Sequence, residues 1–318
     1  LFLLAIIVFF STTPGFLTTN NALNVLRQMS ILAIAAFGSS FIIFSGGLDL
    51  SIGSNAALSG VIAAMAARDV FAVNGLPIEL SWAVGVVIGA LVGLINGLIV
   101  VRLHISPIIT TLGTLTIARG LALTLTGGVS LFGVPEGFRE LGRGFLIPGV
   151  IPIPVVIMFI IFVIGWILLR KSMFGLYIYG IGGNEEASRL SGVPVNRVKI
   201  AVYIIGGAMA GLAGTVLASR LGSGQAAGSQ GLELDVITAI VLGGASIAGG
   251  SGTIVGTFIG VLIISILENG MTLMNIDPFY QLIVKGLALL IAVGIDQFRK
   301  RRVVRKPRTT MTPKAETS

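Results

Sequence analysis

Long apolar runs, separated by short polar segments, constrain this chain more than any other feature. Only 11% of its 318 residues are charged and its mean hydropathy is +1.00, whereas soluble domains carry charge on about a quarter of their residues. A helix needs roughly 20 apolar residues to cross a bilayer, and it satisfies its own backbone hydrogen bonds there. The sequence therefore predicts an all-α polytopic membrane protein and excludes an ordinary soluble domain.

The apolar runs predict about ten transmembrane helices. The first run is too short to cross a bilayer and begins without a methionine, so we expect the N-terminus and part of the first span to be truncated. Two further runs are short, which predicts broken or half-helices. The expected spans are 1–10, 29–45, 55–67, 82–101, 107–126, 154–169, 200–219, 234–242, 254–267 and 279–295, with external segments at 11–28, 127–152 and 221–233.

Basic residues lie next to those ends of the apolar runs that would face one side of the membrane, and in the C-terminal tail. Cytoplasmic loops of membrane proteins carry an excess of Lys and Arg, so this pattern predicts that both termini are cytoplasmic. It also explains the net charge of +8 without a nucleic-acid partner. We expect a transmembrane domain over 1–298 and a basic, disordered cytoplasmic tail over 299–318. The basic residues on the expected cytoplasmic side are Arg102, Arg170, Lys171, Arg197, Lys199 and those of the tail.

Two short motifs recur and suggest a five-plus-five inverted repeat. Leu48-Asp49 resembles Leu234-Asp235 near the third and eighth spans, and Ile105-Ser106-Pro107 resembles Ile276-Asp277-Pro278 before the fifth and tenth. An odd number of spans in each half would make equivalent helices run in opposite directions, as in many transport proteins. The matches are few, so coincidence stays open as the alternative.

The most polar interruption between apolar runs is 182–192. Asn184 is placed to cap a helix whose first turn holds Glu185 and Glu186, where the helix dipole favours acids. Gly192 and Pro194 would end it after about two turns. So short a helix needs a surface to lie on. From physics alone, a partner-docking element and an ordinary connector are equally supported.

Polar side chains in or near the apolar runs are candidates for a solute pathway or for structural contacts. Asp49 precedes the third span, where a helix cap is the favoured interpretation and an intramembrane function the alternative. Lys285 lies inside the tenth span, and pairing with Asp235 or Glu268 is favoured over snorkelling or lining a pathway. Glu233 has a structural, a functional or a simple water-facing interpretation. The full set is Asp49, Ser51, Asn55, Glu233, Asp235 and Lys285.

The residue inventory argues against chemistry within this chain. It has no cysteine and one histidine, which excludes disulfides, thiolate metal sites and a histidine-rich metal cluster. Its glycine-rich runs lack the Lys-Ser/Thr ending of a nucleotide-binding P-loop. No hydrolytic triad or well-placed carboxylate pair can be argued, so we expect no enzyme, no metal and no cofactor.

Several motifs, in the right order, resemble one family. Glu186-Ala187-Ser188 followed by Gly192 resembles the Glu-Ala-Ala-x-x-x-Gly loop by which permease subunits of bacterial ABC importers engage their ATPase, with Ser188 in place of the second alanine. From about residue 14 to 295 the chain looks like the ribose, arabinose and xylose permeases. The motifs are Gly46-Gly47-Leu48-Asp49-Leu50-Ser51-Ile52-Gly53-Ser54, Ile181-Gly182-Gly183-Asn184-Glu185-Glu186-Ala187, Leu190-Ser191-Gly192-Val193, Glu233-Leu234-Asp235 and Val241-Leu242-Gly243-Gly244.

The resemblance implies a permease in the bacterial inner membrane that forms a sugar pathway as a dimer with a second copy or a paralogue. It implies a sugar-binding protein, periplasmic or lipid-tethered, and a separate ABC ATPase that binds the ATP. The coupling loop would comprise Asn184, Glu185, Glu186, Ala187, Ser188 and Gly192.

Other transport classes remain as alternatives. A branched-chain amino-acid or nucleoside ABC permease would share the loop. An ion-coupled secondary carrier would use Asp49 or Lys285 but leaves the loop unexplained, and a scaffold protein would not need broken spans. The Gly-Leu-Asp-Leu-Ser motif favours a sugar permease, without naming the sugar.

Overall fold

The computed structural model describes residues 7, 10–68 and 76–304, and the side chains of 295–304 are outside that description. Most of the first expected span and the tail beyond residue 304 therefore lie outside the described residues. The elements are α2 (Thr19–Phe44), α3 (Ile52–Ala67), α4 (Ile78–Arg102), α5 (Pro107–Thr126), the 3-10 turn η1 (Glu136–Arg139), α6 (Glu140–Arg143), β1 (Phe145–Ile147), β2 (Ile151–Pro152), α7 (Ile153–Lys171), α8 (Met173–Gly183), α9 (Glu185–Leu190), α10 (Val195–Leu221), α11 (Leu232–Leu242), α12 (Ile254–Leu273) and α13 (Pro278–Val304).

The described chain is almost entirely helical, and its one sheet there is the antiparallel hairpin of β1 and β2. Six of these helices, α2, α4, α5, α7, α10 and α12, are long and apolar enough to cross a bilayer. Shorter apolar helices lie at α3, at α8 and over Pro278–Gly294. The expected all-α polytopic class is confirmed, whereas the count of about ten spans stays a prediction.

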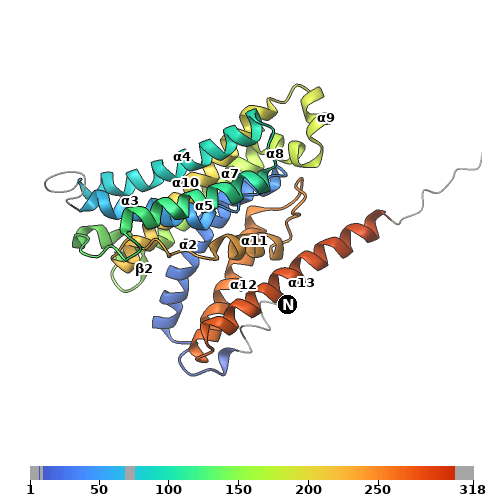
Figure 1. Ribbon diagram of the computed structural model, residues 1–318. Coiled ribbons are helices and arrows are strands. Elements are labelled where there is room, and N and C mark those ends of the chain that lie inside the picture. The colour runs from blue at the N-terminus through green and yellow to red at the C-terminus, as the bar shows by residue number, and fades with distance from the viewer. Residues whose placement is uncertain (1–6, 8–9, 69–75, 305–318) are drawn as a thin grey trace, which may run out of the picture.

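Helix α10 is the centre of the bundle, with α4, α3 and α2 packed along it (Figure 1). Its closest neighbour is α4, because glycines face each other across the contact. A Cβ added at Gly89 would collide with the carbonyl oxygen of Gly207, and one added at Gly207 with that of Gly89. Small residues allow backbones in membranes to approach closely and gain dispersion energy. The high glycine content thus serves helix packing.

Helix α2 begins earlier than the sequence predicted. Residues 19–28 were expected as a loop and an amphipathic approach, yet they are helical from Thr19. Thr18 caps the helix through its hydroxyl, and Asn21 forms a reciprocal amide pair with Asn269 of α12 at 2.9 and 2.8 Å. A distant partner therefore satisfies the asparagine that suggested a loop.

The segment 127–152, predicted as the longest external loop, is folded into η1, α6 and the hairpin. Phe138 is fully buried, and its carbonyl accepts hydrogen bonds from Ser219 at 2.7 Å and from Trp82 at 3.3 Å. The Ser219 hydroxyl also accepts one from the amide of Gly142 at 2.7 Å. These contacts fix the segment to the C-terminal end of α10.

One helix boundary also differs at the C-terminal end of the described chain. Helix α13 continues to Val304, so residues 299–304 of the expected disordered tail are helical.

The two Leu-Asp pairs of the suggested repeat occupy different positions. Asp49 stands before α3, whereas Asp235 lies in the first turn of α11. The two proline motifs do match, since α5 and α13 begin at Pro107 and Pro278.

Candidate functional site

Helix α9 forms as the sequence predicted. Asn184 is its cap, and the Asn184 side chain accepts a hydrogen bond from the amide of Ala187 at 2.9 Å. Gly192 has φ +82°, a left-handed conformation that glycine adopts without steric cost. The amide of Val193 then donates to the carbonyl of Ser188 at 3.1 Å, which closes the C-terminal turn.

One side of α9 contacts the helix bundle and the other side is exposed. Ser188 is buried, and Glu185 pairs with Lys199 of α10 at 2.9 Å and with Arg189 at 3.2 Å. Glu186 and Leu190 are exposed, and Leu190 is 82% exposed. In Figure 1, α9 stands at one end of the molecule beside α8. Helix α9 therefore exposes Glu186 and Leu190 to solvent while Glu185 attaches it to α10.

The electrostatics of Glu185 support this attachment. Partial burial raises the pKa of Glu185, but the hydrogen bond and charge of Lys199, together with Arg189, outweigh it and hold that pKa below the ordinary glutamate value. The carboxylate is therefore charged at neutral pH.

The contacts that precede α9 were not foreseen from the sequence. Gly182 at the end of α8 packs against the carbonyl of Phe44 and the amide of Gly250, which leaves no room for a side chain. The amide of Gly250 donates to the same Phe44 carbonyl at 3.0 Å. Gly249 also packs against Gly46 and Gly182, so glycines from the end of α8 and from the turns after α2 and before α12 meet here. Their Gly-Gly pairs were the only signal in the sequence.

A buried polar chain connects α3, α4 and α5. The Asp49 Oδ1 accepts hydrogen bonds from the amide of Ser51 at 2.8 Å and from its hydroxyl at 2.6 Å. Asn96 donates to the Ser51 hydroxyl at 2.9 Å and accepts from Thr114 at 2.6 Å. The helix cap is Ser51, so the prediction that Asp49 caps α3 is corrected. Asp49 closes the turn before the helix, because its carboxylate reaches the amide two residues ahead.

Asn55 also has a structural position. Its amide donates to the carbonyl of Gly89 at 3.2 Å and to that of Gly207 at 3.4 Å. These carbonyls belong to α4 and α10 at their closest approach. Asn55 accepts in turn from Ser59 at 3.2 Å. The side chain therefore joins three helices.

Lys285 forms the ion pairs that the sequence suggested. Its ammonium lies 2.9 Å from Asp235 Oδ2 and 3.1 Å from Glu268 Oε1. The three residues come from α13, α11 and α12, so they hold these helices together. Each side chain keeps 17–27% of its surface accessible. We call this group the Lys285 triad.

Glu233 does not join the triad. Its Oε2 is buried against Gly53 and has no hydrogen-bond partner among the described residues, although the residue as a whole is half-buried. Its water-facing interpretation stays a prediction. Arg119 of α5 donates to the carbonyl of Gly228 at 2.9 Å and to that of Ala226. An arginine inside an apolar run thus holds the loop before α11.

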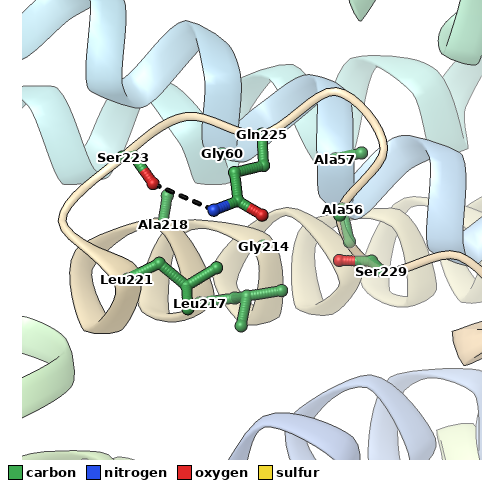
Figure 2. Close-up of a pocket in the computed structure, with 11 residues that line it drawn as sticks. Ala56, Ala57, Gly60, Gly214, Leu217, Ala218, Leu221, Ser223, Gln225 and Ser229 are labelled. Atoms are coloured by element: carbon green, nitrogen blue, oxygen red, sulfur yellow. Dashed lines mark hydrogen bonds between the residues drawn. The ribbon is translucent and has the colours of Figure 1, made fainter. Parts of the chain in front are cut away.

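That loop covers a small pocket between α3 and α10. Figure 2 shows Gln225 pointing from the loop into the pocket, with its amide donating to Ser223 at 3.1 Å. The pocket has a volume of about 10 Å³, which is room for at most one water. It is too small for a solute.

Comparisons with known proteins agree with this architecture. The family model described as branched-chain amino acid transport system / permease component matches residues 21–293. A ribose import permease protein of Bacillus subtilis (strain 168) is 46% identical over 93% of this chain and 90% of its own length. An L-arabinose ABC transporter permease protein of Azospirillum brasilense is 39% identical, over 91% of this chain and 83% of its own. A galactose/methyl galactoside import permease protein of Escherichia coli (strain K12) is 36% identical, over 95% and 93%.

No solved structure matches the chain. The match to the family model covers most of the sequence, and the relatives align over nearly its whole length. This chain therefore belongs to the family of transport-system permease components described by that model.

Proposed function

We propose that this chain is the membrane-spanning permease subunit of an ATP-driven importer of a monosaccharide. Its relatives are named as import permeases for ribose, arabinose and galactose. The family description mentions branched-chain amino acids, which keeps an amino-acid importer as the second candidate. Identities of 36–46% with the sugar permeases favour the sugar.

Helix α9 is the observation that carries the coupling role. It is too short to be stable alone, yet it is capped at both ends and fastened to α10 through Glu185 and Lys199. Its exposed Glu186 and Leu190 offer a surface to a partner. Because the chain has no nucleotide-binding motif, that partner is the ATPase subunit.

ATP-driven movement of the partner would reach the bundle by two routes. One is α10, through the pair of Glu185 and Lys199. The other is the glycine contact of Gly182 with Gly250 and Phe44, which leads to the turn before α3. Two alternative arrangements of packed helices would then open the pathway to either side.

The remaining partners follow from this orientation. With α9 in the cytoplasm of a bacterial cell, both termini are cytoplasmic in the inner membrane. The folded segment 127–152 and the loop 222–231 lie at the opposite end of α10, where a sugar-loaded binding protein would dock. A second copy or a paralogue completes the pathway as a dimer.

The test is co-expression of the chain with the ATPase and binding protein encoded beside it. Copurification from detergent and ATP hydrolysis in liposomes that rises with a ribose-loaded binding protein are the expected results. Glu186→Lys reverses charge on the docking surface, so we expect copurification and uptake to fall by about tenfold or more, with normal membrane insertion.

Glu136→Lys is the matched control, because Glu136 is also exposed but belongs to η1 at the other end of the molecule. It should retain the ATPase. If no ATPase copurifies and the chain alone moves solute with an ion gradient, the carrier alternative replaces this proposal. Stimulation by a leucine-loaded binding protein alone would favour the amino-acid importer.

A further inference from the structure

A second, larger cavity lies at the end of the bundle opposite α9. Its volume is about 400 Å³, within the range of about 300–1,000 Å³ typical of small-molecule sites. Residues of α2, α10, α11, α12, α13 and the loop 222–231 line this open cavity, and the Lys285 triad forms part of its wall. Its polar lining includes Gln28, Arg220, Gln230, Asp235, Glu268 and Lys285.

The directions of α10 and α11 show at which end of the bundle this cavity lies. Helix α10 starts beside α9 and ends at Leu221, and Arg220 and Leu221 line the cavity. Asp235 lies in the first turn of α11, which follows the loop 222–231. Both elements therefore bring the cavity to the side where the proposed function puts the binding protein.

The lining has no net charge. Arg220 and Lys285 are basic, Asp235 and Glu268 are acidic, and the other lining residues are uncharged. A charged solute would add an unbalanced charge at a partly buried site, which is unfavourable. The lining therefore suits a neutral solute.

The same lining suits a solute with many hydroxyl groups. Lys285 contacts one oxygen of each carboxylate, Asp235 Oδ2 and Glu268 Oε1, and a carboxylate has several acceptor positions. The triad is 17–27% accessible. Amides and the Arg220 guanidinium supply donors, and leucines such as Leu32 and Leu217 supply apolar walls for C–H groups. A monosaccharide has both hydroxyl groups that can donate to the carboxylates and C–H groups that can contact the leucines.

We propose that this cavity binds one neutral monosaccharide at the outer end of the permease, with Asp235 and Glu268 accepting hydrogen bonds from its hydroxyls. Lys285 holds the two carboxylates in place through its ion pairs with both. The inference rests on the proposed function, because the import direction identifies this end as the entry side.

The first test uses protection from chemical labelling. The chain has no cysteine, so Gln230→Cys places a single thiol in the cavity wall. In the assembled complex, ribose should slow its modification by a thiol reagent, and ribose 5-phosphate should not. Ala227→Cys is the matched control, since Ala227 is exposed on the same loop but does not line the cavity. Equal labelling of Gln230→Cys with and without ribose would overturn the inference.

The second test uses Glu268→Gln, which removes one charged acceptor and leaves the pair of Lys285 and Asp235. Loss of one hydrogen bond to a charged group should raise the KM for ribose uptake by about tenfold, with unchanged copurification of the ATPase. Glu79→Gln, exposed in the first turn of α4 and outside the proposed docking segments, is the control. An unchanged KM in Glu268→Gln would contradict the site.

These outcomes are separate from failure of the proposed function. A wild-type complex that shows no ribose-stimulated ATP hydrolysis would reject ribose import, while labelling of Gln230→Cys would still decide whether the cavity binds the sugar. A complex that imports ribose without protecting Gln230→Cys keeps the function and rejects the cavity.

Discussion

Lys199 of α10 donates a hydrogen bond to Glu185 of α9 at 2.9 Å, and this contact fixes the exposed helix to the central one. Helix α10 has 27 residues, about 40 Å at 1.5 Å per residue. Its other end carries Arg220 in the wall of the 400 Å³ cavity. A single helix therefore joins the proposed ATPase contact to the proposed sugar site.

We expect Lys199→Met to uncouple the two sites. The substitution keeps the apolar stem and removes the charge that holds Glu185. ATP hydrolysis by the assembled complex should continue while ribose uptake per ATP falls. Arg197→Met, on an exposed position of the same helix turn, is the control. An unchanged uptake-to-hydrolysis ratio in Lys199→Met would argue against transmission through this pair.

The ion pair should affect stability only slightly, and with a defined pH dependence. Because the pKa of Glu185 is lowered in the folded protein, its contribution is fully present above the ordinary glutamate pKa of about 4.3. It is lost as pH falls through the lowered pKa. Since Glu185 is 43% exposed, the effect stays below about 1 kcal/mol. The Tm difference between wild type and Glu185→Gln should be constant from pH 7 to about pH 5 and shrink below about pH 4.

Asp49→Asn should transport normally, whereas Asp49→Ala should not. An asparagine side chain can accept the hydrogen bonds that Ser51 donates to Oδ1, because both residue types form this turn. Alanine removes the acceptor and frees the turn before α3. Uptake measured at equal expression distinguishes the two variants. Lost uptake in Asp49→Asn would indicate that the charge itself has a function.

Gly89→Ala should destabilise the protein by about 1–3 kcal/mol. The added methyl group meets the backbone of α10 at Gly207 and Gly211, which cannot move aside without separating two central helices. Gly113→Ala is the control, since a Cβ there meets no atom within 4 Å. Thermal unfolding in detergent should show a lower Tm for Gly89→Ala alone. Equal Tm values would mean that the α4–α10 contact is looser than described.

Single cysteines should reveal the orientation in the membrane. Leu190 on α9 and Phe132 in the segment 127–152 are 82% and 66% exposed, and they lie at opposite ends of the molecule. In spheroplasts, a membrane-impermeant thiol reagent should label Phe132→Cys at once and Leu190→Cys only after permeabilisation. The reverse pattern would invert the proposed topology.

Some local features could be predicted from the sequence, because they depend on residues that are neighbours in the chain. The polar start, acidic first turn and Gly192 predicted α9 correctly, and the spacing of apolar runs predicted the helical membrane class. Lys285 could be assigned to a carboxylate partner, because an isolated charge inside an apolar run needs one. Local capping and charge pairing are strong enough to be recognised in the sequence.

Other features depended on residues far apart in the chain. Asn21 suggested a loop until Asn269 paired with it, and Asp49 was assigned to a cap that Ser51 occupies, with Asn96 and Thr114 completing its network. The sequence alone determined that the chain forms apolar helices and where α9 begins. Only the tertiary structure decided which helices meet along α10 and that Arg220 and the Lys285 triad share a cavity, because packing, not local propensity, chooses the partners of buried polar groups.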